Sequence, residues 1–540
     1  MKSMFALQRF KKCIILFMTG IICSILTYVI YTVNPVNTIT QYHLQITPHT
    51  FLFSMWKKPP LDVFLSVYVF NITNPVEFLS GKEKLKVQEL GPYVYQEYLE
   101  NHNVTFNDND TMTYIPKRTI IYVPEKSVRN PAEDLITVPN IAYLGASSAL
   151  HNAGFLVNYP LTQLATMIGA KPILNMSVHE YLWGYEDKLV SLASNIVPSF
   201  INFQKFGLLD RMYDEGENIV TINLRKNDNM LEEKGRYLSI DKFNGSPGLS
   251  QWGYVNTRDN ETRKENTACN TIQGATEGII FPSYMDKRAV FKVYRKAFCR
   301  ALPIVFKKEV VTVQGLPGYL YVLKDGFADP PDQNPENECY CLNKKKCLKK
   351  GLMDLTPCYY NIPAAVSLPH FLDADPTLLE NIEGLEPNRE KHDSYVILQP
   401  TLGVPIQGRS RVQTNLILQH TRYNPDITAF NNLTVPLMWT EMIIPSLPLY
   451  LKIGVQLVLQ VFPVVQAVLM YLLGVAGVTT IILSLIVFLR ILTQQQKKKQ
   501  EMIKTIDNSD LNIPLCNGQY SSINIFPTLK KITSKTDLFS

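Results

Sequence analysis

Two long apolar segments without charge constrain this chain more than any other feature. Residues 453–489 contain no acidic or basic side chain over 37 positions, and residues 13–33 contain none over 21 positions. A helix of about 20 apolar residues is long enough to cross a bilayer. Each segment therefore predicts one membrane-spanning helix, and the chain between the two segments is predicted to fold in a single compartment.

The first apolar segment follows a basic leader, MKSMFALQRFKK, as a signal peptide would. A cleaved signal peptide has a shorter apolar stretch and a small-residue cleavage site, whereas this run continues into TYVIYTVNP. The pattern favours an uncleaved anchor over residues 13–33. In the second segment, Pro463 predicts that the crossing covers residues 464–489, with the preceding turns at the membrane interface.

The charges that flank the apolar segments predict their orientation. Basic residues precede the first segment and follow the second: Lys2, Arg9, Lys11 and Lys12, then Arg490, Lys497, Lys498, Lys499 and Lys504. The positive-inside rule places both tails, residues 1–12 and 490–540, in the cytosol. Residues 34–463 then form an ectodomain, outside the cell or in the lumen of an endosome or lysosome. Because the net charge of +6 comes from the tails, it does not indicate a nucleic-acid partner.

The nine cysteines divide by compartment under this topology. Cys13 and Cys23 fall in the first span and Cys516 in the cytosolic tail. An even set in an oxidising compartment predicts three disulfides, with fifteen connectivities open. Zinc binding is the alternative, but a CxC pair with single cysteines and no histidine among them is poor spacing for zinc. The six ectodomain cysteines are Cys269, Cys299, Cys339, Cys341, Cys347 and Cys358.

All seven N-x-S/T sequons lie between the two spans, on the predicted exterior side. Such sequons are acceptors for N-glycosylation in secreted domains. Their placement agrees with the topology that the charges predict. The seven are Asn71, Asn103, Asn109, Asn175, Asn244, Asn260 and Asn432.

The ectodomain sequence is typical of strands, interrupted by one helical insertion. Residues 61–71 alternate apolar with small or polar side chains, several short strands follow within 85–123, and strands resume near residue 219. Between residue 139 and about residue 207 the apolar spacing becomes helical, and Ser177 to Glu180 form a capping box that opens one helix carrying EYLWGYEDKLVSLAS. These patterns predict an α+β domain of antiparallel strands with helices at one end. The insertion suits a recognition surface, with a purely structural cap as the alternative.

Motifs for catalysis or metal binding are incomplete in this sequence. His179 and Glu180 begin like a zinc-protease motif, but Trp183 occupies the position of the second histidine. The stretch 145–149 lacks the closing glycine of a nucleophile elbow. The acidic turn FNDNDT at 106–111 lacks the glycine and terminal glutamate of a calcium loop, which favours a hairpin turn. We therefore predict no enzymatic activity, no cofactor and no metal site.

Several ordered motifs resemble the class B scavenger receptors, a family that includes the fatty-acid translocase glycoprotein, the high-density-lipoprotein receptor, the lysosomal integral membrane protein of type two and insect sensory-neuron membrane proteins. The resemblance runs from Lys11 to Leu492. Its specific pieces are FLFSMWKKPP, NITNPVEF, GPYVY, EYLWGYEDKLV, the CYC pair, SLPHFLDADP and GLEPNREKHDSYVILQPTLGVPI.

The resemblance implies a glycosylated receptor with an antiparallel β-barrel core, a helical bundle at its apex over about residues 142–206, and an apolar tunnel that carries lipid toward the bilayer. It also implies three disulfides: Cys269 with Cys339, Cys299 with Cys358, and Cys341 with Cys347. Basic apical helices bind anionic lipoproteins in several members, but residues 142–206 hold three basic and three acidic side chains here. Lys171 is the best single cationic contact for a ligand.

Two functions are compatible with these features. The leading one is a lipid receptor that takes lipid, lipoprotein or a lipid carrier at the apex and passes hydrophobic ligand through the tunnel. The alternative is a lysosomal or endosomal sorting receptor whose apical helices bind a luminal protein. The identity of the ligand and the choice between plasma membrane and lysosome stay open.

The membrane segments and tails add three smaller predictions. Small residues recur every four positions at Gly20 and Ser24, and at Ala476, Thr480 and Ser484, which predicts contact between spans within one chain or in a homo-oligomer. Cys13, where the basic leader meets the bilayer, is a candidate for reversible acylation, with a buried thiol as the alternative. Tyr520 and Ile523 fit a tyrosine-based sorting signal.

Overall fold

The computed structural model describes residues 2–196, 201, 203–213, 216, 218–225, 235–256, 265–341 and 347–509. The chain forms two compact units. One contains the residues up to Pro35 and those from Pro463 onward, and the other contains Val36–Phe462. Tyr520, Ile523, Cys516 and the sequon asparagine Asn260 lie outside the described residues.

The first unit is built from two long helices, α1 (Lys2–Val33) and α12 (Phe462–Ser509). By length and composition, the helical stretches Gln8–His43 and Leu449–Thr505 are long and apolar enough to cross a membrane. A π-helical turn, Leu457–Val461, leads directly into α12, so the helix is continuous through Pro463.

Small residues bring α1 and α12 into contact. A Cβ atom added to Gly477 would lie 2.8 Å from Ser24 Oγ and 3.2 Å from the carbonyl oxygen of Gly20. Near the other end of the contact, Ser484 Oγ donates to the carbonyl oxygen of Cys13 at 2.9 Å. The prediction of contact between spans is confirmed within one chain. Ala476 was predicted to lie in this contact, but its side chain is exposed and the neighbouring Gly477 faces α1 instead.

The second unit is dominated by antiparallel strands, as their alternating sequence predicted. The strands are β1 (Val63–Ile72), β2 (Leu85–Asn107), β3 (Thr111–Tyr122), β4 (Leu135–Pro139), β5 (Ile173–Ser177), β6 (Tyr185–Glu186), β7 (Lys205–Phe206), β8 (Val220–Asn223), β9 (Ile240–Phe243), β10 (Phe291–Arg295), β11 (Arg300–Val311), β12 (Pro317–Leu323), β13 (Met353–Asp354), β14 (Ala364–Ser367), β15 (Ile382–Glu383), β16 (Tyr395–Gln399), β17 (Val404–Ile417) and β18 (Thr434–Ile444). Where several short strands were expected over residues 85–123, the chain forms the two long strands β2 and β3, joined by the acidic turn.

The large sheet closes into a barrel. Its strands follow the order β10-β11-β12-β16-β17-β18-β1-β2-β3-β8-β9. The edge strand β9 bonds to residues 274–276 through the Ile240 N–H, which donates to the Ala275 carbonyl at 2.7 Å. On its other side the same segment bonds to β10, because the Thr276 N–H donates to the Lys292 carbonyl at 2.7 Å. The segment therefore links the two edges and leaves them both satisfied.

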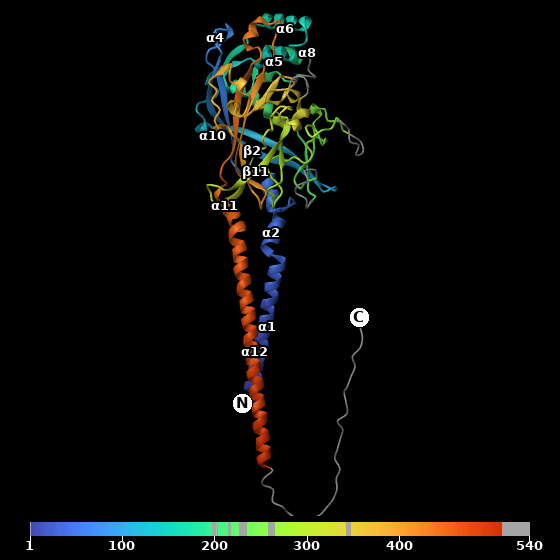
Figure 1. Cartoon of the computed structure of the whole chain (residues 1–540), viewed down its shortest axis with the longest axis vertical. Coiled ribbons are helices and arrows are strands. Elements are labelled where there is room, and N and C mark those ends of the chain that lie inside the picture. The colour runs from blue at the N-terminus through green and yellow to red at the C-terminus, as the bar shows by residue number, and fades with distance from the viewer. Residues whose placement is uncertain are drawn as a thin grey trace, which may run out of the picture. The chain divides into compact units, whose positions relative to one another are not determined.

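Short helices lie mainly at the two ends of this unit (Figure 1). Helices α5, α6 and α8 gather at one end, which we call the helical end, and α2 and α11 lie at the opposite end. The helices are α2 (Pro35–His43), α3 (Phe51–Lys57), α4 (Pro75–Leu79), α5 (Ile141–Ala149), α6 (Phe155–Met167), α7 (Val178–Trp183), α8 (Lys188–Ile196), α9 (Leu208–Tyr213), α10 (Arg389–His392) and α11 (Leu449–Gln456).

The capping box at Ser177 forms as predicted, but the helix that it opens is shorter than expected. Ser177 Oγ accepts the Glu180 N–H, and the Glu180 carboxylate accepts the Ser177 N–H. The helix ends at Trp183 because Gly184 adopts φ 134°, which is incompatible with a helix. A second helix, α8, then begins after Asp187, whose carboxylate accepts the Leu189 N–H at 2.8 Å.

Candidate functional site

The interior of the barrel contains a cavity of about 240 Å³. Its walls come from strands on both sides of the barrel and are mainly apolar. Representative wall residues are Val63, Leu99, Val293, Leu302, Tyr321 and Val396. The cavity also touches Leu61, just before β1, and Ile444, the last residue of β18. We call this space the main cavity.

A second, smaller space adjoins the main cavity. Its volume is about 60 Å³, and it is lined by Leu209 and Met212 of α9. Helix α9 follows the helical insertion in the sequence. We call this space the upper cavity. The wall common to both cavities contains Arg295, Phe298, Ser410 and Met442. The two cavities thus form consecutive compartments between α9 and the opposite end of the barrel.

A cluster of charged side chains lies at this common wall. Glu97 on β2 is buried, and its Oε2 accepts a hydrogen bond from the Tyr213 hydroxyl at 2.8 Å. The other carboxylate oxygen lies 3.4 Å from Arg118 Nε and 3.9 Å from Arg295 Nη2. Burial, and then the nearby Glu97 charge, raises the pKa of Tyr213 well above its usual value. The hydroxyl therefore stays a proton donor to Glu97 at physiological pH. We call these four residues the interior ion cluster.

This cluster is not among the sites predicted from the sequence, although the sequence contains a signal for it. In β2, Tyr93, Tyr95, Glu97 and Leu99 occupy alternate positions, so they share one face of the strand. A carboxylate within an otherwise apolar face indicates a buried partner. Arg295 likewise follows Phe291 and Val293 at alternate positions of β10. The partners themselves come from distant parts of the sequence, and only the closed barrel brings them together.

The helical end presents apolar side chains to its surroundings. On α6, Leu156 is 85% exposed and Met167 is 83% exposed, and Phe155 and Tyr159 stack on each other with ring centroids 5.0 Å apart. Lys171 lies exposed in the turn between α6 and β5, and its carbonyl accepts a hydrogen bond from Asn140. The charge balance and the exposed side chains together make this surface apolar, with Lys171 as a cation beside it.

The described sequon asparagines lie at the surface of the second unit. Asn71 is half-buried, with its side-chain oxygen accepting the Thr137 N–H at 2.8 Å. The others described are exposed: Asn103, Asn109, Asn175, Asn244 and Asn432. Glycosylation of these positions remains a prediction.

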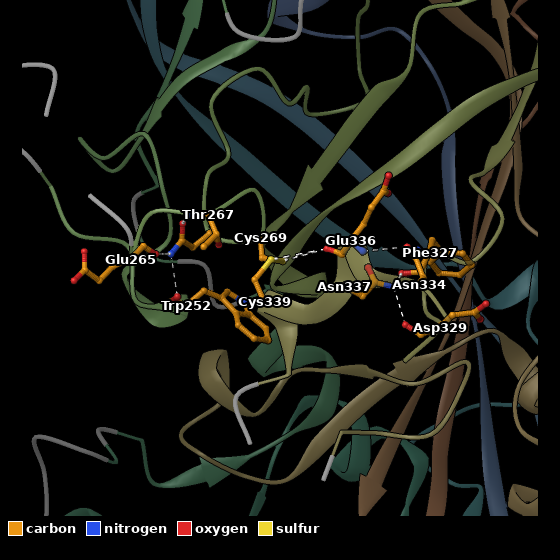
Figure 2. The surroundings of a disulfide bond; sticks show 11 residues. Trp252, Glu265, Thr267, Cys269, Phe327, Asp329, Asn334, Glu336, Asn337 and Cys339 are labelled. Atoms are coloured by element: carbon orange, nitrogen blue, oxygen red, sulfur yellow. Dashed lines mark hydrogen bonds between the residues drawn. A yellow bond between two sulfur atoms is a disulfide. The ribbon is translucent and has the colours of Figure 1, made fainter. Parts of the chain in front are cut away.

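Three disulfides join the pairs that the family resemblance implies. Cys269 is bonded to Cys339, Cys299 to Cys358, and Cys341 to Cys347. Figure 2 shows the first of these bonds beside the turn that contains Glu336 and Asn337. Asn337 Nδ2 donates to the Asp329 carbonyl at 2.7 Å, which holds that turn against the preceding loop.

A second polar cluster lies where the 369–392 segment covers the barrel. His370 Nε2 donates to Glu89 Oε2 at 2.6 Å, and Trp439 Nε1 donates to the same oxygen at 2.7 Å. The imidazole rings of His370 and His392 stack with centroids 4.4 Å apart. Burial, and then the neighbouring His370, lowers the pKa of His392 to about 4. Burial alone would raise the pKa of Glu89, but the hydrogen bonds from His370 and Trp439 outweigh it and lower that pKa.

The two histidines and Glu89 lie close enough to suggest a metal site, because their ligand atoms fall within 4.8 Å of one another. The hydrogen bonds oppose it. His370 Nδ1 accepts the Glu386 N–H at 3.0 Å, and His392 Nδ1 accepts the Asn388 N–H at 3.0 Å. Each neutral ring therefore carries its proton on Nε2, the atom that would have to bind the metal. The arrangement is that of a structural hydrogen-bond network.

Cys13 lies in the contact between α1 and α12. Its side chain is buried, and its thiol donates to the Ser484 carbonyl at 3.3 Å. An acyl chain on this sulfur would require the two helices to separate locally. The buried-thiol alternative thus accounts for the observed position, and acylation remains a prediction.

Comparison with known proteins gives a consistent family. A sequence model of the CD36 family matches residues 13–488. Scavenger receptor class B member 1 of Bos taurus is 30% identical over 400 residues, which cover 74% of this chain and 74% of that protein. Lysosome membrane protein 2 of Mus musculus is 30% identical over 379 residues, which cover 68% of this chain and 71% of that protein. The family match includes both apolar helices and the barrel between them, and the chain therefore belongs to the CD36 family of class B scavenger receptors.

Proposed function

We propose that this chain is a lipid receptor that admits hydrophobic cargo at the helical end and passes it through the barrel toward the bilayer. The observation that carries the proposal is the apolar main cavity, which reaches from the interior ion cluster to the start of β1 and the end of β18. Both of these strand ends lead, through short helices, into the apolar stretches of α1 and α12. No chemical step is required for this function.

Burial of apolar surface supplies the driving force. Moving apolar surface out of water contributes about 25 cal/mol per Å². A lipid that leaves an aqueous carrier for the cavity gains this term, and it retains it on entering the bilayer. The exposed side chains of α6 provide the first apolar contact on this route.

Lipid bound to the detergent-extracted protein tests the proposal directly. Mass spectrometry of co-purifying lipids is expected to find stoichiometric lipid in the wild type. Val396→Trp fills part of the main cavity and is expected to lower the bound amount. The matched control is Val313→Trp, because Val313 is 98% exposed outside the cavity. Equal lipid in all three proteins would contradict the proposal.

The alternative is a sorting receptor that binds a luminal protein through α6, and the exposed Leu156 and Met167 favour it as well. Leu156→Asp with Met167→Asp separates the two functions. A lipid receptor loses lipid uptake in this variant, whereas a sorting receptor keeps cavity lipid and fails to deliver its protein partner. Leu135→Asp, at an exposed position of β4, serves as the control.

We also propose that both tails are cytosolic and that the protein resides in the plasma membrane or the endosomal–lysosomal membrane. The basic residues that flank α1 and α12 support this orientation. Epitope tags at the two termini are expected to stay protected from external protease in sealed cells. The described contacts between spans lie within one chain. A homo-oligomer therefore stays a prediction.

A further inference from the structure

Arg295 occupies an unusual position at the wall between the main and upper cavities. It lies at the end of β10, and its side chain lines both spaces. Among the described residues, its guanidinium meets the Met442 sulfur at 3.5 Å and the Glu97 carboxylate at 3.9 Å. A guanidinium has five N–H donors, and a thioether is a weak acceptor. Most of the hydrogen-bonding capacity of Arg295 is therefore directed into the cavities without a strong acceptor.

A second arginine of the main cavity provides the contrast. Arg409 lines the same space, but its guanidinium donates to Glu441 at 3.2 Å. Glu441 in turn accepts from the buried Arg411 at 2.9 Å. Arg409 thus has a close acceptor, which it shares with Arg411, whereas Arg295 lies farther from a carboxylate that is already bonded to Tyr213.

The interior ion cluster also joins separate elements of the fold. Glu97 belongs to β2, Arg118 to β3, Arg295 to β10, and Tyr213 to α9. The hydrogen bond from Tyr213 to Glu97 ties α9 to the barrel wall at the point where the two cavities meet. A molecule that moves from the upper to the main cavity passes the Arg295 side chain, which lines both spaces.

We propose that the interior ion cluster is a gate that selects cargo by headgroup charge, with Arg295 as the specificity-determining residue. An amphiphile with an anionic headgroup, a carboxylate or a phosphate, gives Arg295 the close acceptor that Glu97 does not provide, and its chain occupies the apolar main cavity. A neutral lipid offers no such exchange and meets the closed wall. This inference rests on the proposed lipid-receptor function and assigns it a substrate class.

Equilibrium binding to the full-length protein in detergent tests the selectivity. The probes are three fluorescent amphiphiles with the same alkyl chain, ending in a carboxylate, a phosphate monoester or a methyl ester. Arg295→Gln is expected to weaken binding of the anions about tenfold, because a charge-assisted hydrogen bond is lost, and to leave the ester unchanged. Arg288→Gln, at an exposed arginine outside both cavities, is the matched control and is expected to bind all three as the wild type does. Preference for the carboxylate or the phosphate identifies the source of the headgroup.

The conservative variant Arg295→Lys keeps the positive charge and is expected to retain the preference for anions over the ester. If Arg295→Gln binds all probes weakly, comparison with Arg295→Lys shows whether the glutamine variant has lost its selectivity or its fold. The inference is overturned if Arg295→Gln weakens binding of the anions and of the ester equally, or if Arg295→Gln binds the anions as strongly as Arg288→Gln does. If the wild type binds none of the three probes, the lipid-receptor proposal itself fails.

The gate is tested by the rate of entry. Tyr213→Phe removes one hydroxyl from the buried cluster and leaves its charges in place. We expect the methyl ester to enter the main cavity about threefold faster in this variant, since one hydrogen bond no longer holds the wall closed. Tyr98→Phe, at an exposed tyrosine of the same barrel, is the control. An entry rate equal to that of the wild type would show that the cluster does not gate the cavity.

Discussion

The His392 side chain makes stability depend on pH in a specific window. Its pKa is lowered to about 4 in the folded chain, whereas an unfolded histidine titrates near pH 6.5. Between these values the unfolded chain binds the proton and the folded chain does not, so stability falls as the pH drops from about 6.5 to about 4. The fall is at most about 1.4 kcal/mol per pH unit, and solvent screening reduces it.

His392→Asn tests this prediction, because the asparagine oxygen can still accept the Asn388 N–H but does not titrate. Thermal unfolding at pH 7 and pH 5 is expected to show a smaller loss of stability in the variant than in the wild type. Parallel losses in the two proteins would assign the pH dependence to other groups. The lowered pKa of Glu89 adds a further loss in the acid range, below about pH 4.5.

Cys13 provides a second test at the residue scale. If the thiol is acylated, acyl-exchange labelling of the wild type exceeds that of Cys13→Ser. Cys23, at an intermediate burial in the same helix, is the matched control through Cys23→Ser. Identical labelling of wild type and Cys13→Ser would leave the buried contact with Ser484 as the whole role of this cysteine.

These residues mark what the sequence could and could not predict. Strand β1 follows from alternation, and the capping box at Ser177 follows from local hydrogen bonding. The network of Glu89, His370 and Trp439 joins side chains far apart in the sequence. No local pattern encodes such pairing, because it depends on how the covering segment lies on the barrel.

At the scale of elements, two features could not be predicted from the sequence: the point where one predicted helix divides and the segment that closes the barrel. The apolar spacing of EYLWGYEDKLVSLAS is helical throughout, and the single glycine at 184 suffices to divide it into α7 and α8. The segment 274–276 closes the barrel through backbone hydrogen bonds to β9 and β10. Backbone groups are the same in every residue. A closure that they make therefore leaves no pattern in the sequence.

The contact between α1 and α12 gives a prediction for elements. Gly20→Leu is expected to separate the helices, because an added Cβ would already lie 3.0 Å from the Gly477 carbonyl. Ala476→Leu is the matched control, since Ala476 is exposed on the same helix as Gly477. Cysteine cross-linking between the spans of the full-length protein measures the effect. Equal cross-linking of both variants and the wild type would contradict the contact.

At the scale of the whole molecule, two of the disulfides join segments that are far apart in the sequence. Cys299 follows β10 and lies in the buried core, where Trp252 Nε1 donates to its carbonyl at 2.7 Å. Its partner Cys358 precedes β14. This bond and the one from Cys269 to Cys339 span 59 and 70 residues. Each is expected to stabilise the ectodomain by about 4 kcal/mol through the entropy of the unfolded chain.

The bond from Cys341 to Cys347 spans only 6 residues, so the same model assigns it a smaller effect of about 2 kcal/mol. Cys299→Ser is therefore expected to block export of the glycosylated protein, and the double variant with Cys358→Ser is expected to be no worse, because both lose the same bond. Cys341→Ser with Cys347→Ser is expected to be milder. Surface labelling of cells measures export, and peptide mapping of the non-reduced protein reads the pairing. A crosslink from Cys269 to Cys299 would overturn the connectivity on which this ranking depends.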